Sequence, residues 1–196
     1  MTVLFPHTRS RRLELRPASA DDRAEFVRTL LRTGIESVTP ARARASLDSC
    51  ASFLVALRTS GDVIGFSTLH GLDPAGHLRS GLYLDPARAR FGVGAEGMYL
   101  TTNYAFAAFP VAKLLGQTTE ATFGSIGVAN DDEAKGVLEE HLYFRGRHWN
   151  LHNFEVTRDE WDFLADGHLG DVLGSGPDGQ PLSWRRDPNL APAPAA

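Results

Sequence analysis

The chain has 196 residues, of which 42% are hydrophobic and 22% are charged, which suits one globular domain with a hydrophobic core. A formal net charge of −4 excludes a bulk basic field for nucleic acid, and no apolar run approaches the ~20 residues of a membrane helix. The single cysteine, Cys50, excludes an internal disulfide and fits a reducing, cytoplasmic location.

The first half of the chain predicts a strand, two helices and a meander of three strands. Residues 13–16 alternate as a strand, and a helix over 20–32 follows Ser19 and Asp22, which form a capping-box pattern with Asp in place of Glu. A second helix over 39–47 opens on a Thr-Pro pair, which is typical of a helix start. The meander strands, separated by turn residues, cover 52–57, 63–69 and 77–84.

The second half predicts a long helix followed by shorter elements. The long helix covers 94–109, where Met98, Thr102 and Ala105 recur at helical spacing and Pro110 ends the run. The elements expected after it are a strand over 113–122, a helix over 130–141, two strands over 142–149 and 151–156 around a turn near Asn150, and a short helix over 159–164.

This order of elements predicts an α+β fold, with one mixed, mostly antiparallel sheet and helices on both of its faces. The chain from Ala165 is rich in Gly, Pro and Asp, and that composition predicts a mobile tail. The expected parts are an N-terminal extension over 1–10, one domain over 11–164 and a C-terminal tail over 165–196.

A glycine loop over residues 88–95 is the strongest functional signal. It joins the last meander strand to the long helix, whose first turn has unpaired N–H groups and the positive end of the helix dipole. Glycines there allow a phosphate to approach the backbone closely. Gly92, Gly94 and Gly97 also have dinucleotide-binding spacing, but a meander stands where the Rossmann fold requires a βαβ unit. The loop therefore predicts a phosphate site of another fold.

The loop and its surroundings resemble the GNAT (N-acetyltransferase) superfamily over roughly residues 11–162. Asp85-Pro86 followed by Gly92-Val93-Gly94 is similar to its Gln/Arg-x-x-Gly-x-Gly/Ala motif. Ala95-Glu96-Gly97-Met98 and Phe144-Arg145-Gly146 resemble the branch that acetylates the N-termini of ribosomal proteins. The resemblance implies a site for the pyrophosphate and pantetheine of acyl-CoA, without a metal. The donor-binding residues that it implies are Leu82, Tyr83, Leu84, Arg88, Arg90, Phe91, Gly92, Val93, Gly94, Ala95 and Asn130.

The resemblance also implies direct attack of an acceptor amine on the donor thioester. A backbone N–H of the strand 77–84 would hold the carbonyl oxygen. The titratable groups expected near the thioester are Glu120, His141 and Tyr143. Glu120 is a candidate base, directly or through water, or else an exposed strand residue. His141 ends a predicted helix, where a cation also complements the dipole.

Departures from the family motif leave three interpretations open. Ala89 occupies the Gln/Arg position, Glu133 stands where a Ser or Ala is usual after Asn130, and Leu138 replaces the usual tyrosine acid. The first interpretation is an acyl-CoA N-acyltransferase acting on a small molecule or a protein N-terminus. The second is a GNAT enzyme that uses an acyl carrier protein, and the third is a non-catalytic CoA-binding module. The acidic carrier would meet scattered arginines, namely Arg42, Arg44, Arg88 and Arg90. The sequence also leaves open whether the chain forms a homodimer.

Overall fold

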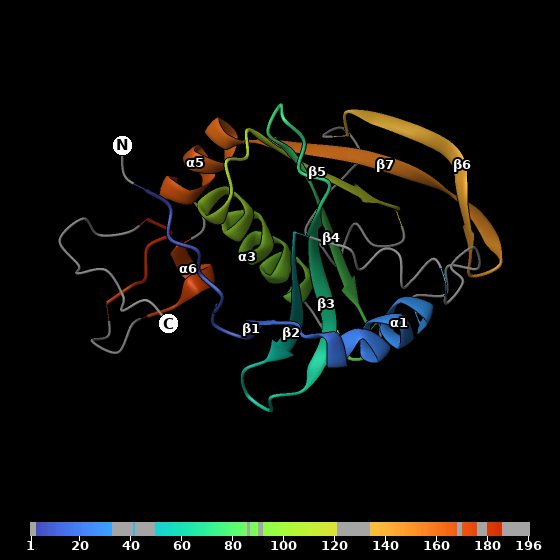
Figure 1. Ribbon diagram of the computed structural model, residues 1–196, viewed down its shortest axis with the longest axis horizontal. Helices are drawn as coiled ribbons and strands as arrows, with labels where there is room; N and C mark the ends of the chain where they lie inside the picture. Colours follow the sequence, from blue (N-terminus) through green and yellow to red (C-terminus); the bar gives the residue numbers. More distant parts are fainter. Residues whose placement is uncertain are drawn as a thin grey trace.

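The structure is a computed structural model that describes residues 3–32, 41, 50–85, 87–89, 92–120, 134–167, 170–175 and 180–185. Within these residues, seven strands form one sheet in the order β1-β2-β3-β4-β5-β7-β6 (Figure 1). The strands are β1 (Leu13–Pro17), β2 (Ala51–Leu57), β3 (Val63–His70), β4 (His77–Leu84), β5 (Lys113–Thr118), β6 (Gly136–Phe144) and β7 (Arg147–Thr157). The β4–β5 pair is parallel and every other pair is antiparallel, which confirms the mixed, mostly antiparallel sheet.

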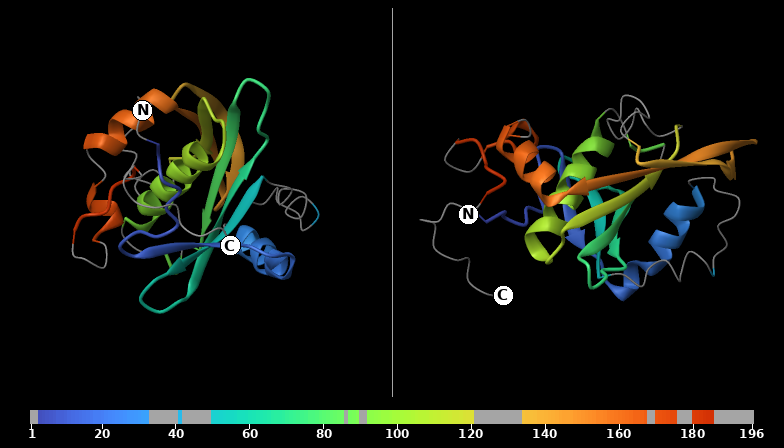
Figure 2. Two further views of the ribbon diagram at one scale, coloured as in Figure 1. Left: turned by 60° about the vertical axis from the view of Figure 1, so that its left-hand side comes forward. Right: turned by 90° about the horizontal axis from the view of Figure 1, so that it is seen from above.

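Helices cover both faces of the sheet, as the order of elements predicts. Helix α1 lies on one face, and α3 and α5 lie on the other (Figure 2). The described helices are the 3-10 turn η1 (Ala20–Asp22), α1 (Arg23–Arg32), α3 (Val93–Ala108), α5 (Arg158–Gly167) and α6 (Gly170–Leu173). Within the described parts of the chain, none of them has the length and apolar character needed to cross a membrane.

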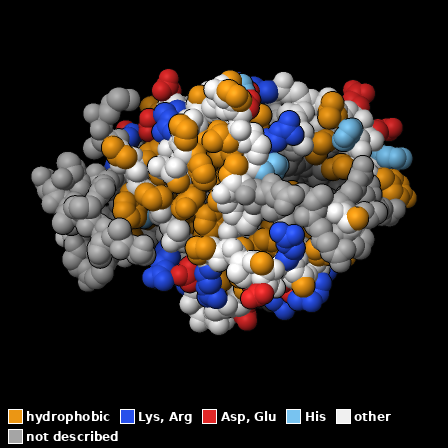
Figure 3. Space-filling view, in the orientation of Figure 1, with side chains coloured by type: hydrophobic (Ala, Val, Ile, Leu, Met, Phe, Trp, Pro, Cys, Tyr) orange, Lys and Arg blue, Asp and Glu red, His pale blue; other side chains and the backbone are white. Residues whose placement is uncertain are grey.

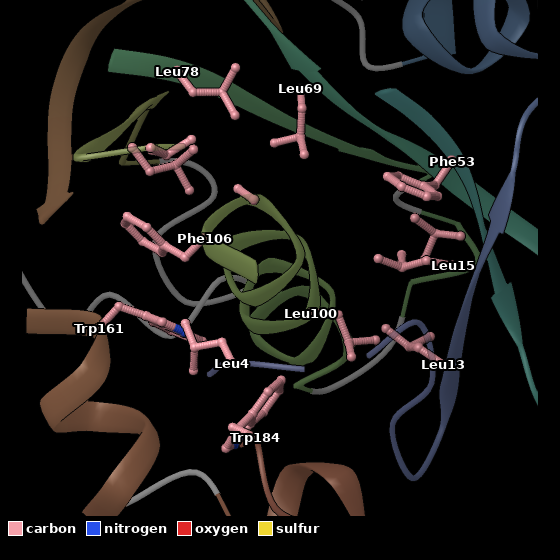
Figure 4. Close-up of a cluster of buried hydrophobic side chains, with 14 of the residues drawn as sticks. Leu4, Leu13, Leu15, Phe53, Leu69, Leu78, Leu100, Phe106, Trp161 and Trp184 are labelled. Carbon is pink, nitrogen blue, oxygen red and sulfur yellow. The ribbon is translucent and has the colours of Figure 1, made fainter. Parts of the chain in front are cut away.

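The hydrophobic core is divided by the sheet into two clusters. The larger cluster lies on the α3 face, where Phe53 and Leu69 of the sheet meet Leu100 and Phe106 of α3 (Figure 4). On the α1 face, Phe26 and Leu30 pack on Phe66 of β3. Hydrophobic side chains also gather on the outer surface over α3, as a space-filling view shows (Figure 3). Helix α3 is therefore apolar on more than one side, as expected of a central helix.

Most elements predicted up to the long helix are confirmed. The four strands β1 to β4 and helix α3 begin and end within one residue of the predicted bounds. The capping box is present, because the backbone N–H of Ser19 donates to Asp22 Oδ2 at 2.8 Å and the Ser19 hydroxyl accepts from the backbone of Asp21. The predicted helix over 39–47 lies outside the described residues except for Ala41, which is helical.

The predictions for residues 130–156 are wrong in two respects. Residues from Gly136 onward form β6, so His141 lies on a strand rather than at the end of a helix. The Leu- and Glu-rich segment favours a helix locally, but pairing with β7 decides its conformation. The hairpin turn lies at Arg145-Gly146 rather than near Asn150. Both turn residues have positive φ, 53° and 77°, which suits a tight two-residue hairpin.

Both ends of the chain contribute to the core. Leu4, Leu173 and Trp184 are each no more than 5% exposed and pack in the larger cluster, although the sequence places them in an extension and a tail. Figure 4 shows Leu4 and Trp184 in this cluster. The backbone N–H of Phe5 donates to the carbonyl of Trp184 at 2.8 Å. The fully buried Asn103 of α3 donates to the carbonyl of Phe5 at 2.6 Å. The tail predicted from Ala165 thus includes segments that pack firmly on α3.

Candidate functional site

The sheet opens between its two parallel strands. Pairing of β4 with β5 runs from His77 and Lys113 to Arg79 and Leu115. Beyond Arg79, β4 continues to Leu84 on β3, while β5 continues on β7. The two strands therefore diverge toward their C-terminal ends, as the strand directions in Figure 1 show. An opening of this kind exposes one edge of β4 to a ligand.

The backbone of β4 presents alternate residues to this opening. The N–H of Asp85 donates to the carbonyl of Ile64 on the β3 side at 2.8 Å. Successive residues of a strand direct their backbone groups to opposite edges, so Tyr83 also faces β3. Leu82 and Leu84 then direct their N–H and C=O groups toward the opening. Leu82, Tyr83 and Leu84 are the β4 residues expected at the donor site. The backbone groups of Leu82 and Leu84 suit a linear ligand that contains amides.

The glycine loop leads from the open edge of β4 to the first turn of α3. Gly92 is the N-cap, with a left-handed φ of 73° and without a side-chain cap, a conformation that favours glycine. Val93, Gly94 and Ala95 form the first turn, where helical N–H groups lack helical acceptors. The predicted strand-to-helix junction is confirmed here. Arg90 and Phe91 lie outside the described residues.

Asp85 organises the turn that begins the loop. Its carbonyl accepts from the backbones of Arg88 at 3.0 Å and Ala89 at 2.8 Å, and its carboxylate accepts from Ala87 at 3.0 Å. The Arg88 side chain turns back to the start of β3 and donates to the carbonyl of Val63 at 2.9 Å. Arg88 is therefore held beside β3 in this structure, although the sequence places it among the phosphate-binding residues.

A carboxylate and a buried histidine meet beyond the end of β5. Oε1 of Glu120 lies 2.9 Å from Nε2 of His152, whose side chain is 1% exposed, whereas that of Glu120 is 37% exposed. Burial raises the pKa of Glu120, while hydrogen bonds involving His152, its own backbone and Asn150 lower it, and the pKa ends below its ordinary value. Glu120 is thus an ionised carboxylate that solvent can reach, although its lowered pKa makes it a weaker base than an ordinary glutamate.

His152 is a candidate site residue that the sequence analysis missed. It lies on β7 opposite Thr118 of β5. Its closeness to Glu120 follows from strand register between segments more than thirty residues apart, and no local pattern in the sequence indicates that register.

His141 and Tyr143 both lie on β6, and Tyr143 lies far from Glu120. Both are exposed, and the ring of Tyr143 contacts that of His148, with 5.0 Å between centroids. His148 is four residues from His152 along β7, which corresponds to about 13 Å of strand. The structure therefore does not bring the three predicted catalytic residues together. Asn130 lies outside the described residues.

Tyr83 places a phenol near the point where β4 leaves β5. Its ring stacks on Phe66, with 4.7 Å between centroids, on the α1 face of the sheet. A Cβ atom built on Gly81 would lie 2.7 Å from Tyr83 Cε2 and 3.0 Å from the hydroxyl, so the ring lies over Gly81. Burial raises the pKa of Tyr83, so the hydroxyl keeps its proton. The side chain is a possible proton donor, although the sequence suggested only a donor-binding role.

Comparison with known proteins identifies the fold. The sequence matches no protein-family model and no curated protein. The structure is similar to a GCN5-related N-acetyltransferase from Brucella melitensis, with a TM-score of 0.59 and 21% identity over 94% of this chain and 96% of that one. It is also similar to the spermidine N-acetyltransferase from Vibrio cholerae in complex with CoA and spermine, with a TM-score of 0.60 and 12% identity over 76% of this chain and 97% of that one. The chain therefore has the GNAT fold that the sequence predicts.

Proposed function

Because the chain has the fold of the GNAT acyltransferases, we propose that it transfers an acyl group from acyl-CoA to an amine. The observation that carries this proposal is the opening between β4 and β5, which leads directly to the glycine N-cap of α3. The opening offers backbone amide groups to pantetheine, and the helix start offers N–H groups to pyrophosphate. Together, the strand edge and the helix start suit both chemical parts of the donor.

In the proposed reaction, Leu82 and Leu84 bind the pantetheine amides through their backbones, and a β4 N–H polarises the thioester carbonyl. Glu120 accepts a proton from the acceptor amine, directly or through water. The amine nitrogen forms a bond to the carbonyl carbon, and the carbon–sulfur bond breaks. Tyr83 then donates its proton to the departing thiolate and regains one from solvent.

The acceptor is proposed by class only. A primary amine, on a small molecule or at a protein N-terminus, has the nucleophile that this reaction requires. The spermine bound to the Vibrio cholerae enzyme is an amine of the first kind. The ionised Glu120, past the end of β5, would also attract a protonated amine. Such an amine must lose two protons to form the amide, one before attack, to water, and one to Glu120.

The proposal is tested by incubating the protein with acetyl-CoA and a panel of amines, namely spermidine, free amino acids and short peptides with unblocked N-termini. Release of free CoA and an acetylated product of the expected mass would support it. A Glu120→Gln variant controls for acetylation without enzyme. Tight CoA binding without turnover on any amine would favour a non-catalytic CoA-binding module instead.

A further inference from the structure

A buried carboxylate lies in the first turn of α3, beside the proposed phosphate site. Glu96 is 5% exposed. Its Oε1 atom accepts from the backbone N–H of Arg12 at 2.8 Å and from the hydroxyl of Ser10, and its Oε2 atom accepts from Arg12 Nε at 2.6 Å. The carboxylate is therefore held by the segment that precedes β1, far away in sequence.

The same contacts bring the Arg12 guanidinium to the start of α3. A Cβ built on Gly92 would lie 3.1 Å from Nη2 of Arg12 and 3.8 Å from Nη1, so these nitrogens pack against the N-cap. The Arg12 side chain is 48% exposed, while its Nε side is bound to Glu96. The guanidinium is thus held by Glu96 through its Nε, and its Nη2 and Nη1 lie beside the start of the helix at Gly92.

The charges explain why both residues are present. A carboxylate in a first helical turn is favoured by the helix dipole, but it would repel a phosphate bound at the same turn. Arg12 neutralises Glu96 and places positive charge nearer to Gly92 than the carboxylate lies. No cation is supplied by Ala89, and Arg88 is bound to the carbonyl of Val63.

We infer that Arg12 binds the pyrophosphate of the donor, and that Glu96 positions its guanidinium for that contact. This inference rests on the proposed function, since it assigns a residue to the donor site. It places a cation of the phosphate site on the segment before β1, in addition to any that the loop supplies. Bidentate contact with phosphate oxygens is the recognition for which arginine is suited.

The test compares CoA binding by calorimetry in two variants, Glu96→Gln and the double variant Arg12→Ala with Glu96→Gln. This pair avoids leaving a buried carboxylate without its cation, which Arg12→Ala alone would do. The control is Arg9→Ala, because Arg9 lies on the same segment but pairs with Glu14. Thermal unfolding establishes that all variants are folded.

We expect the double variant to bind CoA about 10- to 100-fold more weakly than Glu96→Gln, as loss of a charged hydrogen bond implies. The loss should be the same for 3′-dephospho-CoA and absent for pantetheine, which has no phosphate. Equal CoA affinity of the two variants, or a loss confined to ligands with a 3′-phosphate, would overturn the inference. A wild-type protein that binds no CoA would instead refute the proposed function.

Discussion

His152 Nε2 lies 2.9 Å from Glu120 Oε1, with the imidazole buried and the carboxylate open to solvent. From this arrangement we propose that Glu120 transfers the proton and that His152 supports it. We predict that Glu120→Gln lowers kcat about 10²- to 10⁴-fold, as expected for loss of a general base, and leaves the affinity for CoA unchanged. Steady-state kinetics with an accepted amine and calorimetry with CoA measure the two effects separately.

The pH profile distinguishes this role of His152 from a purely structural one. The contact with His152 contributes to lowering the pKa of Glu120, so removing it should raise that pKa. Activity needs the ionised carboxylate, and the acid limb of kcat/KM should therefore move to higher pH in His152→Leu. His152→Gln retains an N–H donor and should move it less. An acid limb at the same pH in wild type and His152→Leu would contradict the assignment.

Tyr83 is expected to act through its hydroxyl. Tyr83→Phe keeps the stack on Phe66 but removes the proton donor, so kcat should fall by about 10²-fold or more with stability nearly unchanged. Tyr104→Phe is the matched control, because that ring packs against Phe53 on the other face of the sheet. Similar kcat values for both variants would exclude Tyr83 as the acid.

The C-terminal segment is predicted to stabilise the domain. Trp184 is 1% exposed and meets the edge of Trp161, with 5.9 Å between ring centroids. Trp184→Ala should lower the free energy of unfolding by about 3–5 kcal/mol, as large-to-small changes of buried aromatic residues do. Phe163→Ala, at a side chain 72% exposed on α5, should change it little. Chemical denaturation measures both free energies of unfolding. If Trp184→Ala were as stable as the wild type, the C-terminal segment would not stabilise the domain.

The sequence predicted the parts of the site that depend on local pattern. Gly92 and Gly94 follow an alternating strand and precede a helical repeat, so the junction was visible in the order of residues. The closeness of His152 to Glu120, and of Arg12 to Glu96, depends on how distant segments pair in the sheet or pack on α3. Local propensity also misled at His141, because pairing with β7 overrides helix formers in β6.

The donor is predicted to be free acyl-CoA rather than an acylated carrier protein. Of the arginines expected to meet a carrier, the structure describes Arg88, whose side chain donates to the carbonyl of Val63 and is held beside β3. We predict that transfer from acetyl-CoA is efficient and unaffected by added acetylated carrier protein. A competition assay decides the matter. Clear preference for the carrier, weakened by salt and by Arg88→Glu, would contradict the prediction.

The most direct test of the account is calorimetric titration of CoA into the wild-type protein and into Gly94→Asp. Gly94 is buried in the first turn of α3, and an aspartate there adds a side chain and a like charge beside the pyrophosphate. The account predicts that the wild type binds CoA and that the variant, folded by circular dichroism, binds it at least ~10-fold more weakly. Equal affinity of the two proteins, or no binding by the wild type, would contradict a donor site at the start of α3.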